Sequence, residues 1–513
     1  MSSRNPPNSN TNRPLALGVT FVYIDRDVGR SSPIPLAEVR LGEIARSGIP
    51  VPAYDRARLR PGIVHVGVGG FHRAHLAVYL HELAARGDGW GIVGLGMLAA
   101  DADMAAALGA QDYLYSLIEK GGGEPSVQVI GSIVDFVHAP PGHDAAAWDL
   151  IAAPSTSILS LTVTESGYAE LPDAERAAGG RTTFDRIAAG LAVRRDRAAG
   201  PITILSCDNL PGNGDAARRA TLSAAARLDA TLPAWVEERC TFPNSMVDRI
   251  TPATSRDDRD WLRESAGIVD RWPVVSEPFR QWVMEDDFAA DRPPWEVAGA
   301  LFTDHLDDWE QYKLRMLNAG HSCIAYLSAL AGLTYVHEAM AVPPVRMFLE
   351  SLLHREAIPT VDEIPGHPRE EYAASVVERF ANVGVRDQIA RVCIDGSAKF
   401  PTFLIPTIER HIESGGPIEH AATSLAGWAR YLGVVDPNEQ AFDADGDVAR
   451  RYAARATTDP VAFLAYEPVF TPSVRSSARF RSAFAAGYEQ VATMGPLSAM
   501  RAASEMQGAG GPP

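Results

Sequence analysis

The sequence predicts an α/β domain followed by a mainly α-helical domain. The chain has 513 residues, more than a single hydrophobic core usually organises, so two domains are expected. Short apolar runs alternate with helical patterns in the first part of the chain, which is typical of a parallel sheet. Beyond Pro293 and Pro294 almost every segment has a helical pattern. We therefore expect an α/β domain over residues 41 to 303 and a helical domain over residues 304 to 500.

Composition and charge exclude several classes of protein. Hydrophobic residues make up 46% of the chain and charged residues 22%, as in soluble globular proteins. The net charge of −17 repels nucleic acids and anionic membranes, so neither is expected as a partner. The four cysteines are far apart and form no CxxC pair, which suits a reducing cytoplasm better than a disulfide framework or a zinc ribbon. No apolar run approaches the roughly 20 residues of a membrane span.

Both ends of the chain have the composition of extensions. Residues 1 to 40 are predicted to be a poorly ordered extension, and residues 501 to 513 a loose tail. The apolar stretch from Leu15 to Ile24 is similar to the core of a signal peptide. It has no small-residue cleavage site and runs directly into Asp25, so secretion is not expected.

The first element of the α/β domain is a strand over residues 63 to 66, followed by a glycine turn and a helix to Arg86. Strand, glycine turn and helix form the context that a dinucleotide fingerprint requires. Gly67 permits the tight turn, Gly69 lets the backbone approach a pyrophosphate, and the helix start offers N–H groups to the anion. His72 replaces the third glycine of the fingerprint. The cofactor-binding residues predicted in this turn are Gly67, Gly69, Gly70 and Phe71.

The next strands end in polar residues. Residues 91 to 96 form a predicted strand, and Asp101 lies just beyond it, where a carboxylate can accept hydrogen bonds from an adenosine ribose and repel a 2′-phosphate. Asp101 therefore favours NAD over NADP, although it could also cap a helix. Apolar runs at 157 to 164 and 201 to 206 are predicted to be buried parallel strands. They lead into Glu165 and Asn209, and ligands bind beyond the carboxyl ends of such strands. Asn209 also suits an ordinary turn.

Three later segments complete the inventory. Residues 242 to 252 cannot be assigned from their periodicity, and residues 272 to 278 are predicted to form one more strand. In the helical domain, Arg391 and Lys399 flank a Gly-Ser turn. They could bind substrate hydroxyls or lie on a solvated surface.

The most informative stretch is residues 309 to 322. As a regular α-helix, at about 100° per residue, it places Lys313, Glu310, His321 and Asn318 on one arc of roughly 140°. The remaining surface is apolar, which is typical of a buried helix. A desolvated lysine loses affinity for its proton and can act as a general base. Alternatively, Lys313 and Glu310 form an ordinary i, i+3 pair and His321 is a satisfied core histidine.

Taken together, these motifs resemble the polyol-specific long-chain dehydrogenase/reductase family over roughly residues 50 to 495. The matching motifs, in order, are GVGGFHRAH (67–75), TVTESGY (162–168), SCDNLPGNG (206–214), FPNSMVDRITP (242–252), KLRMLNAGHS (313–322) and DGSAKFPTFLIPTI (395–408). The chain departs from the family pattern at Met97 and Leu98, where relatives often carry an arginine, and at Ala319 and Gly320, where relatives often have Gly-Ser.

The resemblance implies a metal-independent, NAD-dependent polyol dehydrogenase with its active site between a Rossmann-type domain and a helical domain. It implies that Lys313 is the general acid/base and that Asn209 and Asn318 are the amide pair around the reacting oxygen. Further roles implied in the same way are substrate positioning by His321, polyol contacts from Val247, Asp248, Arg391 and Lys399, and gating or proton relay by Glu310.

The first hypothesis for the reaction is the interconversion of D-mannitol and D-fructose. The alternatives within the family are a fructuronate reductase and an arabinitol 4-dehydrogenase. A catalytically silent NAD-binding sensor and a zinc polyol dehydrogenase represent other classes. No Cys/His/Glu cluster has convincing zinc spacing, so no metal is expected. The expected partner is a small polyol or ketose, and the expected assembly is a monomer or a small homo-oligomer.

Overall fold

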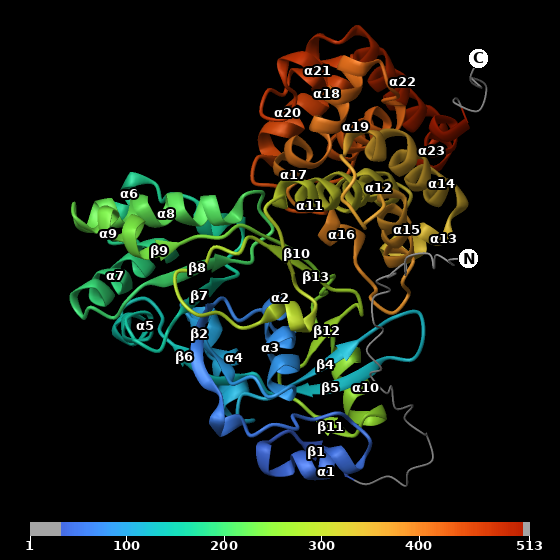
Figure 1. Cartoon of the computed structure of the whole chain (residues 1–513). Helices are drawn as coiled ribbons and strands as arrows, with labels where there is room; N and C mark the ends of the chain where they lie inside the picture. Colours follow the sequence, from blue (N-terminus) through green and yellow to red (C-terminus); the bar gives the residue numbers. More distant parts are fainter. Residues whose placement is uncertain (1–31, 506–513) are drawn as a thin grey trace, which may run out of the picture.

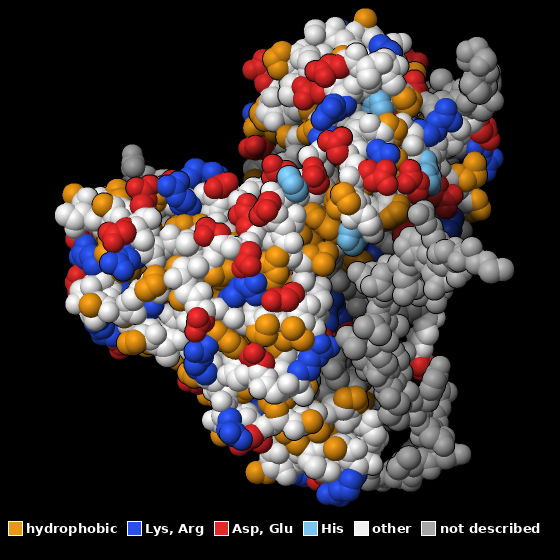
Figure 2. Space-filling model, in the orientation of Figure 1, with side chains coloured by type: hydrophobic (Ala, Val, Ile, Leu, Met, Phe, Trp, Pro, Cys, Tyr) orange, Lys and Arg blue, Asp and Glu red, His pale blue; other side chains and the backbone are white. Residues whose placement is uncertain are grey.

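The computed structural model describes residues 32–505, apart from the side chains of Glu165, Ser166 and Asp173. An α/β domain forms the lower part of Figure 1 and a helical domain the upper part. On the face in Figure 2 the outline is indented where the lobe of α6 (Asp173–Ala177) and α8 (Asn213–Leu228) meets the helical domain. Acidic side chains gather around this junction, in keeping with the net charge of −17.

The core of the α/β domain is a six-stranded parallel sheet in the order β6-β3-β2-β7-β8-β9. Its strands are β2 (Arg60–Val66), β3 (Trp90–Gly96), β6 (Ile133–His138), β7 (Ile158–Leu161), β8 (Ile202–Ser206) and β9 (Cys240–Thr241). In chain order the sheet runs 3-2-1-4-5-6, the doubly wound order of dinucleotide-binding domains. The order reverses between β2 and β7, so the carboxyl ends of these two strands border the crevice where such domains bind ligands. The predicted Rossmann-type domain is confirmed.

Helices cover both faces of this sheet because successive strand residues point to opposite sides. Ile63 packs on the face covered by α3 (Leu76–Ala85) and α4 (Ala102–Gly109). Val64 packs on the face covered by α5 (Ala145–Ile151), α7 (Thr183–Asp196) and α8. A short helix, α2 (Gly70–Ala74), begins directly at the glycine turn, and α9 (Leu232–Arg239) precedes β9. Buried strands with apolar side chains on both faces explain the continuous apolar runs of the sequence.

Smaller sheets complete the α/β domain. One contains β12 (Val274–Ser276), β4 (Tyr115–Glu119) and β5 (Ser126–Ile130). Another contains β10 (Ser245–Asp248), β13 (Gln281–Met284) and β14 (Leu301–Phe302). A two-stranded pair joins β1 (Ile34–Pro35) to β11 (Ile268–Val269), beside α1 (Leu41–Arg46) and α10 (Arg256–Ser265). The segment that periodicity could not assign, residues 242 to 252, therefore contains β10.

The helical domain is built around α19 (Glu419–Val434), whose Trp428 is fully buried. The helix α19 packs against α12 (Ala319–Leu330), α20 (Gly446–Ala456), α22 (Ala478–Met494) and α23 (Pro496–Glu505). The remaining helices are α11 (Leu306–Tyr312), α13 (Val336–Ala341), α14 (Pro343–Leu352), α15 (Arg369–Phe380), α16 (Ile389–Val392), α17 (Gly396–Phe403), α18 (Ile405–Ser414) and α21 (Pro472–Ser476). Two π-helices, η6 (Lys313–Asn318) and η7 (Leu353–Ala357), contact each other.

Several predicted boundaries differ from the structure. The extension predicted for residues 1 to 40 ends earlier, because Ile34 and Leu36 are buried and β1 pairs with β11. Residues 1–31, including the apolar stretch from Leu15 to Ile24, lie outside the described residues. The predicted tail starts later than position 501, because α23 continues to Glu505; residues 506–513 are outside the described part. No helix within residues 32–505 is both long and apolar enough to cross a membrane.

Candidate active site

A pocket lies between the two domains, beyond the carboxyl end of β8. Its α/β side consists of the turn after β8 and part of β10; its helical side is the junction of α11 and η6. The residues lining it are Asp208, Asn209, Leu210, Pro211, Ser245, Met246, Val247, Glu310, Lys313 and Leu314. Four of the predicted site residues are among them. The structure therefore brings together residues that are about a hundred positions apart in the sequence.

Lys313 is the charged group at the centre of this pocket. Its side chain is buried, with 8% of the residue exposed. Its Nζ donates to Oδ1 of Asn209 at 2.5 Å and to the carbonyl of Val247 at 2.7 Å. Both acceptors belong to the α/β domain, so the ammonium group is held across the domain interface. These two neutral acceptors fix the direction of the amine.

The predicted regular α-helix over residues 309 to 322 is wrong in one respect. The α-helical geometry of α11 stops at Tyr312, and Lys313–Asn318 form the π-helix η6 before α12 begins. The N–H of Ala319 donates to the carbonyl of Leu314, five residues earlier. The wider turn of a π-helix brings residue i+5 closer to the direction of residue i than an α-helix does. Asn318 therefore lies closer to the face of Lys313 than the α-helical spacing predicts.

Asn318 and His321 offer hydrogen-bonding atoms that other described residues do not use. The Nδ2 of Asn318 and the Nε2 of His321 are buried and have no hydrogen-bond partner within residues 32–505. Such atoms are costly unless a ligand or water satisfies them. The His321 ring stacks on Phe380, with centroids 3.7 Å apart. Burial lowers the pKa of His321 to about 3, so the ring is neutral. The alternative of a satisfied core histidine does not fit this Nε2.

Glu310 lines the same pocket. Its Oε1 accepts a hydrogen bond from the backbone N–H of Gly212 at 3.0 Å. Burial raises the pKa of Glu310 to about 7, against a smaller lowering by the Gly212 hydrogen bond. A carboxyl group with this pKa exchanges protons readily near neutral pH.

The predicted substrate contacts fall into two groups. The carbonyl of Val247 accepts the hydrogen bond from Lys313. Asp248 is the next residue in the chain, and both of its carboxylate oxygens bond to the Arg379 guanidinium, at 2.7 and 2.8 Å. Arg391 pairs with the buried carboxylate of Asp387 at 2.5 and 2.7 Å. Lys399 donates to the carbonyl of Val392 at 3.1 Å. The carboxylate of Asp387 favours protonation of the His321 ring electrostatically. The Arg391–Asp387 pair therefore lies near that ring.

The glycine turn has the shape that a dinucleotide needs. Gly67 has a φ of +87°, and a Cβ there would lie 2.1 Å from the carbonyl oxygen of Thr162. A Cβ on Gly69 would meet nothing closer than 3.8 Å, so its outer side faces open space at the start of α2. Gly70 begins that helix, and Phe71 stacks on His75. A pyrophosphate can therefore approach the backbone at Gly69 and the first N–H groups of the helix. The fit to a dinucleotide is good.

His72, at the place of the third fingerprint glycine, fills the space below the turn. Its ring stacks on that of His65 with centroids 3.4 Å apart. His65 in turn bonds to Ser160 and to the carbonyl of Gly67, so the two rings support the turn from the sheet side. The missing glycine thus reflects a different packing of helix on strand.

Asp101 lies where the sequence places it, shortly after the carboxyl end of β3. Its Oδ2 accepts a hydrogen bond from the N–H of Leu98 at 2.9 Å, so it caps the turn that leads into α4. The capping role is therefore present, and the expected ribose contact stays a prediction. Glu165 begins a short 3-10 helix (Glu165–Tyr168), but its side chain is outside the described set.

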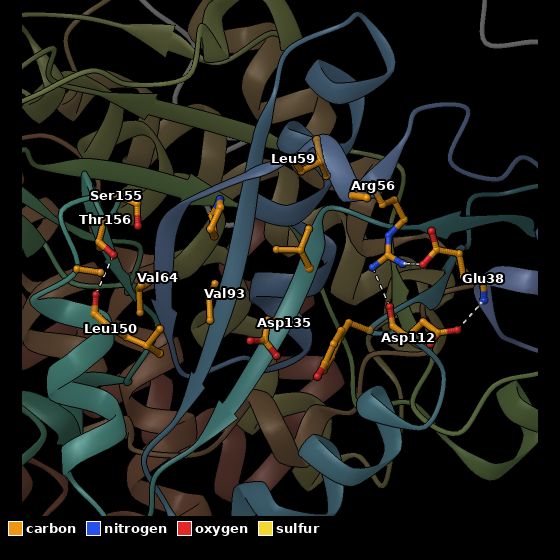
Figure 3. A pocket seen from close by; sticks show the side chains of 15 residues that line it. Glu38, Arg56, Leu59, Val64, Val93, Asp112, Asp135, Leu150, Ser155 and Thr156 are labelled. Atoms are coloured by element: carbon orange, nitrogen blue, oxygen red, sulfur yellow. Dashed lines mark hydrogen bonds and ion pairs between the residues drawn. The ribbon is translucent and has the colours of Figure 1, made fainter.

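A second cavity, larger than the interdomain pocket, lies elsewhere in the α/β domain (Figure 3). It lies toward the amino ends of β2, β3 and β6, away from the glycine turn, over an apolar floor that includes Val64 and Val93. On its rim the Arg56 guanidinium bonds to Glu38 and to the carbonyl of Asp112. Ligands of open α/β sheets bind at the carboxyl ends of the strands, so this cavity is not the expected reaction site. Within residues 32–505 no group of three potential metal ligands occurs.

Sequence reasoning missed Arg379 and Glu277. Arg379 stands inside an ordinary amphipathic helix pattern, and nothing local marks it as buried. Glu277 lies near the end of the strand predicted at 272 to 278 and directly follows the observed strand β12, so the rule that picked out Glu165 and Asn209 could also have picked out this carboxylate.

Comparison with known proteins supports one family. The family model described as the mannitol dehydrogenase Rossmann domain matches residues 61–297, and that of the mannitol dehydrogenase C-terminal domain matches residues 305–492. A mannitol 2-dehydrogenase of Aspergillus terreus is 39% identical over 497 residues, covering 91% of this chain and 99% of the relative.

Two solved structures resemble the whole chain. The Pseudomonas fluorescens mannitol 2-dehydrogenase, in a ternary complex with NAD and D-mannitol, is 38% identical, with a TM-score of 0.83 over 91% of this chain and 99% of that one. A D-sorbitol dehydrogenase in substrate-free form is 33% identical, with a TM-score of 0.80 over 91% of this chain and 100% of that one. On its sequence, its fold and its two matched domains, the chain belongs to the mannitol dehydrogenase family.

Proposed function

We propose that this protein is a metal-independent, NAD-dependent oxidoreductase that interconverts D-mannitol and D-fructose. The observation that carries the proposal is the buried Lys313 Nζ, held at 2.5 Å from Asn209 and 2.7 Å from the Val247 carbonyl in the interdomain pocket. A family member of 38% identity, aligned over 99% of its length, is described in complex with NAD and D-mannitol, which supports both the cofactor and the substrate.

The reaction removes a hydride from the carbinol carbon and a proton from its hydroxyl. When bound, NAD accepts the hydride. Neutral Lys313 takes the hydroxyl proton as the carbon–oxygen bond becomes a carbonyl, and in the reverse direction its ammonium group returns the proton. Negative charge grows on the reacting oxygen during hydride loss. The unused Nδ2 of Asn318 is suited to stabilise it, with Asn209 completing the amide pair from the other domain.

Glu310 is suited to pass the proton on. It lines the pocket with Lys313, and its pKa of about 7 lies between that of an ordinary carboxyl group and that of a lysine. In this role the carboxylate receives the proton that Lys313 has taken from the alcohol and releases it toward solvent. Its hydrogen bond to Gly212 ties it to the turn that follows Asn209.

The cofactor is assigned to the α/β domain, residues 41–303, and the substrate mainly to the helical domain, residues 304–500. Gly67, Gly69, Gly70 and Phe71 would hold the pyrophosphate side, where Gly69 faces open space. Asp101 and Glu165 would contribute beyond the ends of β3 and β7. Asp101 keeps one carboxylate oxygen that is not needed for its bond to Leu98, which suits a ribose hydroxyl and disfavours a 2′-phosphate.

A neutral polyol fits the substrate side better than a sugar acid. Val247, Asp248, His321, Arg391 and Lys399 are the proposed polyol contacts. Asp248 is an anion, and Arg391 already has a carboxylate partner in Asp387. A uronate would bring a further negative charge to a site whose arginine is paired. A fructuronate reductase is therefore the weaker alternative.

All of these residues come from one chain, so the proposal requires neither a second copy nor a macromolecular partner, and it suits a monomer or a small homo-oligomer. The four cysteines are buried and free, which suits the reducing cytoplasm.

A substrate panel tests the proposal. The purified protein is assayed by NADH absorbance with D-mannitol, D-sorbitol and D-arabinitol as alcohols, and with D-fructose and D-fructuronate as carbonyl substrates. Each is paired with NAD(H) and with NADP(H). We expect the highest kcat/KM for mannitol and fructose with NAD(H). Preference for fructuronate would assign the chain to the sugar-acid branch, and NAD binding without turnover of any polyol would support the sensor alternative.

An Asp101→Asn variant separates the two roles of Asp101. Asparagine keeps an oxygen for the Leu98 N–H but removes the charge. We expect unchanged thermal stability and a reduced preference for NAD over NADP. Wild-type efficiency with NADP equal to that with NAD would contradict the cofactor assignment.

A further inference from the structure

The last turn of α15 reaches across the domain interface. Arg379 bonds to both oxygens of Asp248 at 2.7 and 2.8 Å, and its Nη2 and Nε bond to Glu277 at 2.7 and 3.0 Å. Exposed fractions are 8% for Arg379, 3% for Asp248 and 1% for Glu277. Arg379 also lies over the ring of Phe279, 4.1 Å from its centroid. One guanidinium from the helical domain thus holds two carboxylates of the α/β domain, in the two-sided geometry that only arginine provides.

This cluster carries one positive and two negative charges in a buried place. Burying two anions is unfavourable unless a cation and hydrogen bonds offset the loss of water. Glu277 has a second anchor, since it accepts from the Ile250 N–H at 2.6 Å. The hydrogen bonds described for the two carboxylate oxygens of Asp248 both come from the Arg379 guanidinium. Removal of Arg379 would therefore affect Asp248 more than Glu277.

Asp248 is joined directly to the reacting centre. It follows Val247 in β10, and the Val247 carbonyl accepts from Lys313 at 2.7 Å. The strand is fixed on its other side by β13, where Val247 pairs with Trp282 and Asp248 with Gln281. A shift of Asp248 would move the Val247 carbonyl and with it the direction of the lysine amine. The residue after Arg379, Phe380, stacks on His321. Consecutive residues of one helix end thus contact Asp248 of the α/β domain and His321 of the helical domain.

We propose that Arg379 is a positioning residue of this enzyme. It keeps the Asp248 carboxylate ionised and fixes its position relative to Lys313, so that the carboxylate can accept a hydrogen bond from a substrate hydroxyl when the domains face each other. The inference rests on the proposed function. Each oxygen of Asp248 retains a second acceptor site beside the one that Arg379 occupies. Arg379 itself need not touch the substrate, and nothing in the family resemblance assigned it a role.

Charge around Asp248 makes the inference testable by pH. The groups that face it are Arg379 and Tyr372 of α15, Glu277 after β12, Lys313 of η6 and His75 between α2 and α3. Burial alone raises the pKa of Asp248, but the Arg379 charge and hydrogen bonds outweigh it and leave the pKa below its ordinary value. Without Arg379, burial and the neighbouring Glu277 both favour protonation of Asp248.

The experiment compares Arg379→Met with a matched control, Arg346→Met, which removes an exposed arginine paired with Glu350 on α14. For Arg379→Met we expect kcat/KM for mannitol to fall by about 10²-fold, with kcat lowered and KM raised, because the Lys313 amine is displaced and a substrate contact is weakened. NAD affinity, measured by fluorescence titration, should stay within about twofold, a change of less than half a kcal/mol. The remaining activity should fall with decreasing pH at a higher pH than in the wild type, because Asp248 becomes protonated there. The control should match the wild type in all three measurements.

Two further variants keep the test decisive if Arg379→Met folds poorly. Arg379→Lys and the double variant Glu277→Gln/Arg379→Met both leave the cluster with the wild-type sum of charges. We expect each to recover part of the activity and to move the acidic limb of the pH profile back toward lower pH. Wild-type kinetics in Arg379→Met would overturn the inference, as would an equal loss in all three variants with an unshifted pH profile. Failure of the proposed function appears separately, as absence of mannitol turnover in the wild type and in Arg346→Met.

Discussion

The chemistry of the site depends on where one ammonium group is held. Lys313 is buried, but two neutral acceptors from the other domain fix its direction. An isolated buried lysine without such partners would be unstable or displaced. The Nδ2 of Asn318, a residue of the same π-helix, is buried without a hydrogen-bond partner within residues 32–505, so our proposal gives proton transfer and charge stabilisation to two different side chains.

Replacing these two side chains should therefore have different consequences. We expect Lys313→Ala to lower the rate of mannitol oxidation by about 10²–10⁴-fold with NAD binding nearly intact, because the general base is lost. The wild-type rate of oxidation should rise with pH through the lysine pKa, and the rate of reduction should fall; both profiles should flatten in the variant. Methylamine should restore part of the rate. Asn318→Ala should cost about 10²–10³-fold, keep the pH profile and show no amine rescue. If Lys313→Ala kept nearly full activity, the role of Lys313 and of residues 309 to 322 would be structural and not catalytic.

Glu310 should give the protein a distinct pH dependence of stability. Its pKa is raised from 4.5 to about 7 in the folded chain, so the folded state binds this proton more tightly than the unfolded state. The stabilisation is complete below pH 4.5 and is lost as the pH rises toward 7. Compared with Glu310→Gln, the wild type should lose Tm progressively over this interval. A Tm difference that does not change between pH 4.5 and 7 would refute the raised pKa.

The same substitution tests the relay. If Glu310 passes on the proton from Lys313, oxidation by Glu310→Gln should be slower and should lack the limb near pH 7, because an amide cannot exchange the proton. Reduction and oxidation should be affected in the same sense. Wild-type rates and an unchanged limb in Glu310→Gln would leave the residue with only its structural bond to Gly212.

At the level of elements, the glycine turn was predictable because its requirements are local. A strand, a glycine turn and a helix start are visible in the eight residues from 63 to 70, and the structure supplies the reason for Gly67 in its φ of +87°. The π-helix η6 was not predictable in the same way. A π-helix leaves no mark in the spacing of apolar residues, so the α-helical period placed Asn318 too far from Lys313.

Alanine at the two glycines of the turn should separate folding from cofactor binding. Gly67→Ala places a side chain at positive φ and 2.1 Å from the Thr162 carbonyl, so we expect a free energy of unfolding lower by about 1–3 kcal/mol or more. Gly69→Ala has no such conflict within the chain, as the nearest atom is 3.8 Å away. It should keep the wild-type Tm and lose at least about tenfold in NAD affinity, or about 1.4 kcal/mol. Equal NAD affinity in Gly69→Ala and wild type would place the pyrophosphate elsewhere.

For the whole molecule, composition and pattern indicated an α/β part and a helical part, but not how they meet. Bonds across the interface join residues far apart in the sequence: Lys313 and Val247 are 66 positions apart, and Arg379 and Asp248 are 131 positions apart. No periodicity records such pairs, because each partner satisfies the local rules of its own element. The candidate site residues could be listed from the resemblance, whereas Arg379 and the amide geometry around Lys313 required coordinates.

The last prediction concerns metal ions, and it follows from how the whole site divides the charge. A metal-dependent alcohol dehydrogenase lowers the alcohol pKa through a cation held by several Cys, His or carboxylate ligands. In this protein the proposed handling of charge uses Lys313 for the proton and Asn318 for the oxygen. The carboxylate of Asp248 is bonded to Arg379, and that of Glu310 to the N–H of Gly212. We expect full activity after exhaustive dialysis against EDTA and dipicolinate, with metal content checked by mass spectrometry. Added zinc should not increase the rate. If chelation abolished activity, and zinc restored it while NAD alone did not, the group that activates the alcohol would be a metal ion and not Lys313.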